Sequence, residues 1–412
     1  MRFVRRILDR LQPHFGEGGR FERLYPLYEG VDSFLYSPGT VTRGKTHLRD
    51  SLDTKRMMTT VIVALLPCVV MALWNTGFQA NRVLATDDAL AAAAGQEWRG
   101  AILVWFGLDF DPGSLLSNVV YGSLFFFPVY LVCNVVGGAC ELVFCCLRRH
   151  ELNEGMLVTG MLLPLTLPPT IPLWQVALGT CFGVVIGKEV FGGSGRNFLN
   201  PALTARVFLY FNNATSMVGD QVWIAVDGHT AATPLGELAA TDPQSAAELV
   251  GGWSWWDNFL GVTSGSMGET STLACLFGAV VLVGAGIGSW RIMVSLAASA
   301  TAWTLLLNLV GSDTNPLFVL PLEWHFVVGG FAFGTVFMAT DPVSAAMTRT
   351  GQWYYGGLIG FMTILVRVVN PAFPEGIMLA ILFGNVFAPL IDYFVLQANI
   401  KRRRQREGTH EP

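Results

Sequence analysis

The sequence predicts an all-α membrane protein with about ten transmembrane helices in two five-helix halves. The 412-residue chain is 52% hydrophobic and only 14% charged, with a mean hydropathy of +0.47, whereas a soluble domain has about 25% charged residues. Stretches free of Asp, Glu, Lys and Arg are long enough to cross a bilayer. They are residues 57–80, 113–140, 155–187, 270–290, 292–312 and 376–391. The polar stretch 213–272 has seven acidic residues and no Lys or Arg, which is typical of a translocated loop.

Residues 1–56 carry eleven Lys or Arg and precede the first predicted span. Apolar residues near helical spacing alternate with arginines at the start of this region. This pattern predicts a basic amphipathic helix that lies on an inner membrane surface or on a partner. No apolar core precedes Met57, so we expect a cytoplasmic region and no signal peptide.

Ten membrane segments follow from the apolar runs and the Pro and Gly residues that interrupt them. They are residues 57–76, 117–147, 155–168, 173–191, 198–212, 271–290, 292–311, 325–346, 352–369 and 376–396. The predicted regions are a first membrane half, an external loop, a second membrane half and a basic cytoplasmic tail. Their bounds are 57–212, 213–270, 271–396 and 397–412.

Lys and Arg are distributed unequally about these segments. Of the 26 in the chain, 22 fall on one side of the membrane and only Arg82 and Arg99 on the other, while Arg206 and Arg367 lie in or at the ends of spans. Positively charged residues accumulate on the cytoplasmic side. The asymmetry therefore predicts a multi-pass protein with both termini in the cytoplasm and the 77–116 loop outside.

The cysteines and histidines give no metal-site pattern. All seven cysteines lie in or at the ends of apolar segments without a CxxC pair, so we expect packing residues rather than disulfides or zinc ligands. The histidines have no metal-ligand spacing, and we expect surface or interface positions for His47, His150, His229 and His325.

Segments interrupted by proline recur at matching positions of the two halves, in residues 155–212 and 339–396. Such pairs are typical of inverted repeats with broken helices, and they indicate a binding site at the interface between the repeats. The two halves are therefore predicted to be inverted repeats.

A glycine-rich turn, residues 192–196, leads into Asn197 and Asn200 and the 198–212 segment. Backbone N–H groups at a helix start can hold a polar or anionic ligand. The two asparagines are three residues apart and are expected to share a helix face, where their amides can bond a flat heterocycle. The alternative is a tight turn followed by a capped helix.

Ionisable residues within membrane segments are costly and usually functional. The candidates are Glu141, Lys188, Glu189, Arg206, Asp341, Arg367, Glu375 and Asp392. Arg206 and Arg367 are each expected to pair with an acid. Gly137 and Gly138, one turn before Glu141, permit close approach of a ligand or close helix packing.

Several long sequence motifs are similar to those of one known family. They are Val136 to Gly138 with Glu141, and residues 150–155, 188–193, 195–202, 339–345 and 369–376. Over essentially its whole length, the chain resembles the B subunits of sodium-translocating NADH:quinone oxidoreductases. The homologous D subunits of Rnf electron-transfer complexes are shorter, so the long N-terminal region favours the quinone reductase.

In this family the external loop carries FMN, attached through its phosphate to the last residue of an Asp-x-x-Ser-Gly-Ala-Thr motif. The corresponding stretch is 227–233, where Asp227 and Thr233 keep the spacing, Thr230 replaces Ser and Ala231 replaces Gly. The resemblance implies covalent FMN on Thr233, with Thr230 as the less favoured acceptor. It also implies a separate flavin transferase on the outer side.

Further site residues follow only from the resemblance. It implies that Asn197 and Asn200 contact a non-covalent riboflavin in the membrane. It also implies that quinone binds near Gly137, Gly138 and Glu141.

Two acidic residues, Asp341 and Asp392, match family positions associated with Na⁺ uptake, and carboxylate oxygens suit this ion. The resemblance implies a six-subunit complex of the bacterial inner membrane that uses NADH. This subunit would relay electrons from FMN through riboflavin to ubiquinone, with outward Na⁺ transport. Two alternatives are a non-redox channel or transporter of similar architecture, and an Rnf-type relay without quinone. Bound flavin would exclude the first, and quinone with NADH as donor would exclude the second.

Overall fold

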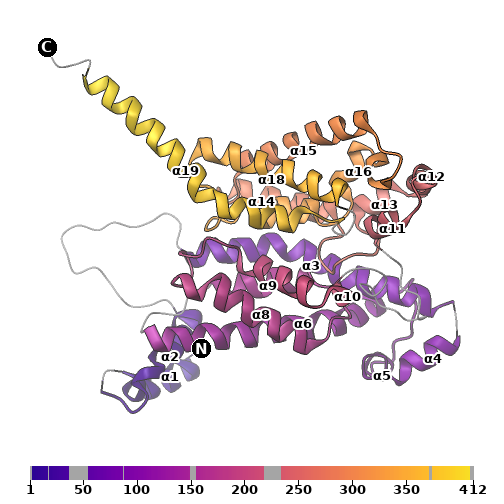
Figure 1. The fold of residues 1–412 in the computed structure, drawn as a ribbon. Helices are drawn as coiled ribbons and strands as arrows, with labels where there is room; N and C mark the ends of the chain where they lie inside the picture. Colours follow the sequence, from indigo (N-terminus) through magenta and orange to yellow (C-terminus); the bar gives the residue numbers. More distant parts are fainter. Residues whose placement is uncertain are drawn as a thin grey trace.

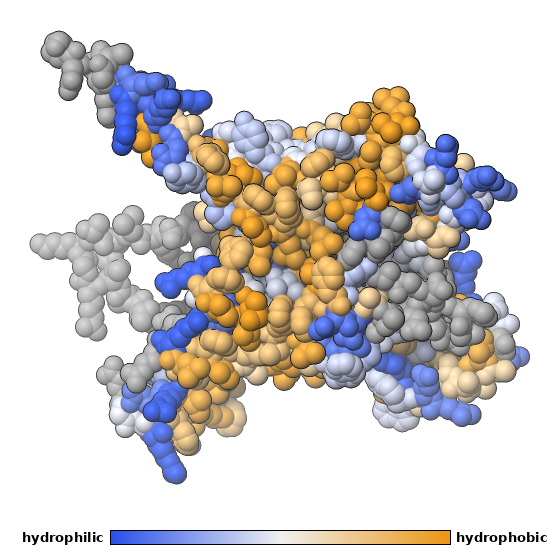
Figure 2. All heavy atoms as spheres, viewed as in Figure 1, coloured by the Kyte–Doolittle hydropathy of each residue, from blue (hydrophilic) through white to orange (hydrophobic). Residues whose placement is uncertain are grey.

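The computed structural model describes residues 2–16, 18–36, 54–86, 88–148, 155–217, 233–370 and 374–408. These residues form helices joined by loops, and no strand occurs among them. Figure 1 shows the helices of the two halves stacked as two layers that run in a common direction. Figure 2 shows apolar residues across the middle of this face and hydrophilic residues towards both ends, as expected for a protein surrounded by lipid.

The first half consists of five main helices. They are α3 (Thr54–Leu84), α6 (Leu115–Arg148), α7 (Gly155–Leu165), α8 (Leu173–Gly187) and α9 (Pro201–Asn212). A 3₁₀ turn, η2 (Glu189–Phe191), follows α8. Within this half, α6 packs against α3, α7 and α8, and α9 packs against α7 and α8.

The second half has a matching order of elements. They are α14 (Thr272–Gly284), α15 (Trp290–Val310), the short pieces α16 (Leu322–Val327), α17 (Phe331–Phe333) and η4 (Gly334–Met338), then α18 (Arg349–Val369) and α19 (Ile377–Gly408). Here α18 packs against α15 and α19, and η4 contacts α14, α15 and α19.

Each of the ten predicted membrane segments overlaps a helix or a run of short helices. Five helices in the described parts of the chain are long and apolar enough to cross a membrane: α3, α6, α8 with η2, α15 and α19. Two shorter helices, α7 and α14, are also apolar. The prediction of an all-helical, multi-pass chain is therefore confirmed in its main features.

The predicted membrane segment 325–346 is not one continuous helix. The residues form α16, α17 and the π-helical η4, followed by turns up to the start of α18. Gly329 has φ +71°, a left-handed conformation that ends α16. Asp341 precedes Pro342, which disfavours a helical conformation at Asp341.

Smaller helices lie at the two ends of the bundle (Figure 1). At one end are α1 (Arg2–Phe15), η1 (Glu22–Leu24) and α2 (Tyr25–Leu35), and the C-terminus also lies at this end. At the other end are α4 (Asp88–Gln96), α5 (Trp98–Trp105), α11 (Pro234–Ala240), α12 (Ala246–Gly252) and α13 (Trp255–Leu260). The remaining short pieces are α10 (Ala214–Met217) and η3 (Pro316–Val319).

Small residues allow the long helices to approach closely. A Cβ atom on Gly77 would collide with the carbonyl of Asn118, and one on Gly122 would collide with the carbonyl of Leu73. These two glycines lie on α3 and α6, so they set the distance between the two longest helices of the first half.

The two halves meet along α3 and α14 and, further on, along α9 and α19. Cys68 and Cys275 face each other across the first contact, with their sulfurs 3.9 Å apart. The loop before α14 also joins the end of α7, because Gly268 donates its N–H to the carbonyl of Leu165 at 2.8 Å. Elements of both halves therefore line the space at each end of this interface.

Candidate functional site

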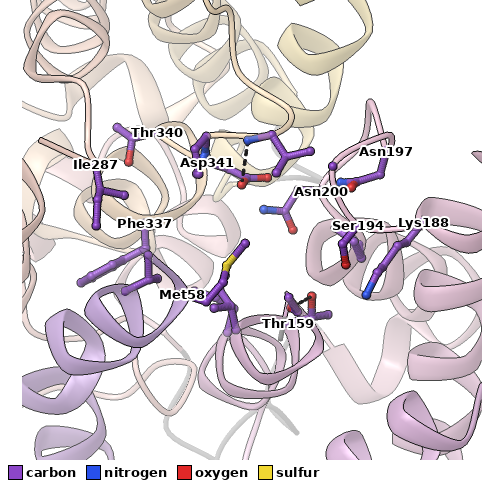
Figure 3. Close-up of a pocket in the computed structure, with 18 of the residues that line it drawn as sticks. Met58, Thr159, Lys188, Ser194, Asn197, Asn200, Ile287, Phe337, Thr340 and Asp341 are labelled. Carbon is purple, nitrogen blue, oxygen red and sulfur yellow. Dashed lines mark hydrogen bonds between the residues drawn. The ribbon is translucent and has the colours of Figure 1, made fainter. Parts of the chain in front are cut away.

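A cavity of ≈ 60 Å³ lies between the two halves, near the start of α3. Figure 3 shows its walls. The first half contributes Met58, Thr159, Lys188, Ser194, Asn197 and Asn200 among others, and the second half contributes Ile287, Phe337 and residues 340–343. The polar groups converge on a site that is otherwise apolar, which is typical of a ligand pocket.

The glycine-rich turn positions the two asparagines. Gly192, Gly193 and Gly195 have φ values of +117°, +91° and +86°, which suit glycine because it lacks a Cβ atom. Asn200 then caps α9, with its Oδ1 accepting from the N–H groups of Ala202 and Leu203 at 3.0 and 3.3 Å. The prediction of a turn that leads into a helix is confirmed.

The expected common helix face of Asn197 and Asn200 is wrong, because α9 begins only at Pro201. Both side chains nevertheless line the cavity. Asn197 donates from Nδ2 to the carbonyl of Leu199 at 3.0 Å, which leaves its Oδ1 free to accept. Since capping occupies Oδ1 of Asn200, its NH₂ group is the part that can donate to a ligand.

Asp341, from the second half, also lines this cavity (Figure 3). One carboxylate oxygen accepts from the hydroxyl of Ser344 at 2.6 Å and the other from the N–H of Val343 at 3.3 Å. These bonds fix the carboxylate in the turn after η4. The structure therefore brings Asp341 together with Asn197 and Asn200, which lie far from it in the sequence.

Asp392 lies elsewhere, on α19, and does not line this cavity. Its oxygens accept from the N–H groups of Met347 and Thr348 at 2.7 and 3.0 Å, and from the Thr348 hydroxyl. Thr348 is the N-cap of α18. The carboxylate thus holds the start of α18 against α19.

A buried ion pair lies next to the cavity. Lys188 Nζ is 2.8 Å from Glu141 Oε1, and the two side chains are 3% and 2% exposed. One turn earlier on α6, a Cβ atom on Gly137 would collide with the flexible end of Met156, whereas one on Gly138 would meet no atom within 4 Å. Close helix packing therefore explains Gly137, and Gly138 faces open space.

A second, smaller cavity of ≈ 20 Å³ lies at the other end of the interface. It lies beside the C-terminal part of α3, where Asn75 donates to the carbonyl of Thr263 at 2.9 Å, and Thr263 is one of its walls. Thr233 also lines it, and this residue begins α11 by accepting from the N–H of Gly236 at 3.3 Å. Thr233 as a residue is half-buried. The other motif positions, Asp227 and Thr230, lie outside the described residues.

Arg206 joins the two halves beside the second cavity. Its Nη1 lies 2.7 Å from Glu269 Oε1 and its Nη2 lies 2.7 Å from Glu375 Oε2. Both acids line the cavity. The expected pairing of Arg206 with an acid is confirmed, and it involves two carboxylates.

The expected acid partner of Arg367 is wrong. Its guanidinium is fully buried and donates to the backbone carbonyls of Glu375, His325 and Val328. His325 is 1% exposed, so its predicted surface or interface position is also wrong. The other histidines named above, His47, His150 and His229, lie outside the described residues.

Sequence reasoning did not single out Glu269 as a partner of Arg206. The acid stood among seven in a loop that looked uniformly polar. One signal was present: Glu269 is the last acid before the uncharged run 270–290, so it had to lie at the edge of the membrane segment.

Comparison with known proteins identifies the family. The model of the NQR2, RnfD, RnfE family matches residues 41–401. The chain belongs to this family. A relative from Stutzerimonas stutzeri (strain A1501) is 55% identical over 404 residues, covering 98% of this chain and 99% of the relative.

Two other members have a similar likeness. A protein from Chromohalobacter salexigens is 53% identical over 409 residues, 99% of this chain and 98% of its own length. One from Pseudomonas aeruginosa (strain PAO1) is 54% identical over 406 residues, 98% of this chain and all of its own length. All three relatives are named as the B subunit of a Na(+)-translocating NADH-quinone reductase. The family resemblance stated from the sequence is therefore confirmed.

Proposed function

We propose that this chain is a membrane subunit of a sodium-translocating NADH-quinone reductase, working in the bacterial inner membrane with the other subunits of the complex. The observation that carries the proposal is the full-length identity of more than half with proteins of that name. The multi-pass helical architecture agrees with a membrane subunit.

The two halves are proposed to be inverted repeats. The element orders match, and several equivalent pairs pack alike: α6 on α8 and α8 on α9 in one half, α15 on α18 and α18 on α19 in the other, although the extensive contact of α3 with α6 has no comparable counterpart between α14 and α15. The contacts between the halves join equivalent members, α3 with α14 and α9 with α19. This symmetry supports one cavity at each end of the interface.

The first cavity is proposed as the riboflavin site. The NH₂ group of Asn200, the Oδ1 of Asn197 and the hydroxyl of Thr159 supply the donors and acceptors that a flavin ring requires. The cavity is smaller than the about 300–1,000 Å³ of typical ligand pockets. Met58, an adaptable side chain on its floor, has to move when a ring enters.

Thr233 is proposed as the acceptor of covalent FMN at the outer end, where a flavin transferase would attach it. This half-buried residue lies at a cavity wall, so a phosphate on its hydroxyl can project from the protein while the ester is partly shielded. The flavins supply the electron transfer, and the protein sets their position and electrostatic surroundings. On this proposal electrons pass from FMN through riboflavin to ubiquinone.

The open space beside Gly138 is proposed as the place where the quinone approaches. The buried Lys188–Glu141 pair lies one turn away, and Lys188 also lines the flavin cavity. A single charged pair would then lie between the two redox partners. Asp341 is proposed to attract Na⁺ from within the first cavity, and Asp392 to act on Na⁺ uptake through the start of α18.

A complementation experiment tests the proposed function. Membranes from cells that lack the endogenous subunit are compared with membranes that carry this chain together with its partner subunits. The proposal predicts Na⁺-stimulated, NADH-dependent quinone reduction only when this chain is present. Full activity without this chain would contradict the proposal. A complex that assembles with this chain but is not stimulated by Na⁺ would also contradict it.

A further inference from the structure

We propose that the cavity beside Thr233 is a second ion site, which binds a monovalent cation of the size of Na⁺ through Glu269, Thr270 and Glu375. The identity of the ion and the outer location rest on the proposed function. The site itself rests on the side chains that line the cavity.

The walls of this cavity are rich in oxygen. The lining residues with a side-chain oxygen are Thr233, Asn258, Thr263, Ser264, Ser266, Glu269, Thr270 and Glu375. No Lys, Arg or His is among the described residues that line it. Hard cations are bound by oxygen ligands of these kinds.

Two buried oxygens in the cavity walls have no hydrogen-bond partner among the described residues. They are Oε2 of Glu269 and Oγ1 of Thr270. Glu269 is 3% exposed and Thr270 is 8% exposed. Buried polar atoms are nearly always satisfied, and an unsatisfied carboxylate oxygen is particularly unfavourable. A cation in the cavity would satisfy both.

The charges nearby favour weak binding of a single positive charge. Glu269 and Glu375 share the guanidinium of Arg206, which leaves one negative charge. Arg367 adds a positive charge behind Glu375, since it donates to the backbone carbonyl of that residue. With both guanidinium groups counted, the charges nearly cancel, so oxygen ligands rather than net charge would hold a monovalent cation, and would hold it weakly, as a release site requires.

The size of the cavity agrees with this assignment. Its ≈ 20 Å³ is about the space that one water molecule needs. A bare Na⁺, which is smaller than a water molecule, can enter, whereas an organic cation cannot. A divalent ion would normally have more carboxylate ligands than the partly neutralised pair here.

The test uses the complete complex in proteoliposomes with its cytoplasmic face outward. The lumen contains NaCl or choline chloride at equal ionic strength, and valinomycin with K⁺ on both sides removes the membrane potential. Initial rates of NADH-dependent quinone reduction are measured at saturating external Na⁺. A release site predicts that luminal Na⁺ inhibits the wild-type complex, because it refills the site.

Glu269→Gln should raise the half-inhibitory luminal Na⁺ concentration about tenfold by removing a charged ligand. Thr270→Val keeps the shape of the side chain and removes an oxygen that bonds nothing else, so it should fold normally and give a smaller rise. Glu237→Gln, on the exposed side of α11, should have no effect. The external Na⁺ concentration for half-maximal activity should stay the same in all three.

An assembled Thr270→Val complex with wild-type luminal inhibition would overturn the ion site, as would a wild-type complex that luminal Na⁺ does not inhibit. The fluorescence of the denatured subunit reports covalent flavin separately. Loss of this signal in the wild type would count against the proposed function, whereas unchanged inhibition in fluorescent variants would count against the ion site alone.

Discussion

The buried pair of Glu141 and Lys188 gives the sharpest prediction for stability. Its Nζ–Oε1 distance is 2.8 Å, and both side chains are almost completely buried. Removing one partner of such a pair leaves an uncompensated charge and destabilises a protein by about 3–5 kcal/mol. We therefore expect Glu141→Gln to lower the free energy of unfolding by about 3 kcal/mol or more.

The double variant Glu141→Gln/Lys188→Met should recover most of this loss, because neither charge remains. An exposed pair on α1 provides the control: Arg5 and Asp9 lie 3.0 Å apart with side chains 45% and 53% exposed. Asp9→Asn should change stability by less than about 1 kcal/mol.

The assay is thermal unfolding of the detergent-solubilised complex, followed by tryptophan fluorescence. Since 1 kcal/mol shifts Tm by about 2–4 °C in proteins of about 150–250 residues and by less in larger ones, Glu141→Gln should lower Tm by a few degrees. Equal Tm values for the single variant and the wild type would refute the inference that this pair is buried and coupled. So would a double variant no more stable than Glu141→Gln.

Three further changes test the proposed sites. Gly138→Leu should fill the open space and raise KM for quinone at least severalfold, while NADH still reduces the flavins. The control is Val135→Leu, on the exposed face of α6. Equal KM values for the two variants would contradict the proposed quinone position. Asn200→Ser should keep the cap of α9, since Ser is also a good N-cap. The native complex should nevertheless contain less riboflavin, measured by chromatography of the extracted flavin. An unchanged riboflavin content would show that the amide does not contact it. Asp341→Asn should raise the Na⁺ concentration for half-maximal turnover more than Asp392→Asn does, because only Asp341 lines the cavity; the reverse order would contradict this assignment.

The membrane segments could be predicted from the sequence because their signal is local. A sufficiently long, uncharged apolar segment can adopt only a few structures in a bilayer. The exception was 325–346, where Gly329 and Pro342 break the helix. Apolar composition alone does not distinguish a continuous span from one that lines a cavity.

The polar sites were predicted only in part, because their partners are distant in the sequence. Arg206 bonds Glu269 and Glu375, which lie 63 and 169 residues away. Nothing local to Arg367 indicates that backbone carbonyls rather than a carboxylate satisfy it. Asn197 and Asn200 were identified from the turn that precedes α9, but the wall formed by Asp341 depends on how the two halves pack.

The covalent attachment of FMN to Thr233 tests the central proposal most directly. The denatured protein, produced with its flavin transferase and partner subunits, is separated on a gel and viewed under ultraviolet light. We expect a fluorescent band for the wild type, some fluorescence for Thr233→Ser, and none for an assembled Thr233→Ala variant. Thr241→Ala, at the other end of α11, should fluoresce like the wild type. A wild-type chain without fluorescence would contradict the proposal, and a fluorescent Thr233→Ala variant would move the attachment to Thr230 or another residue.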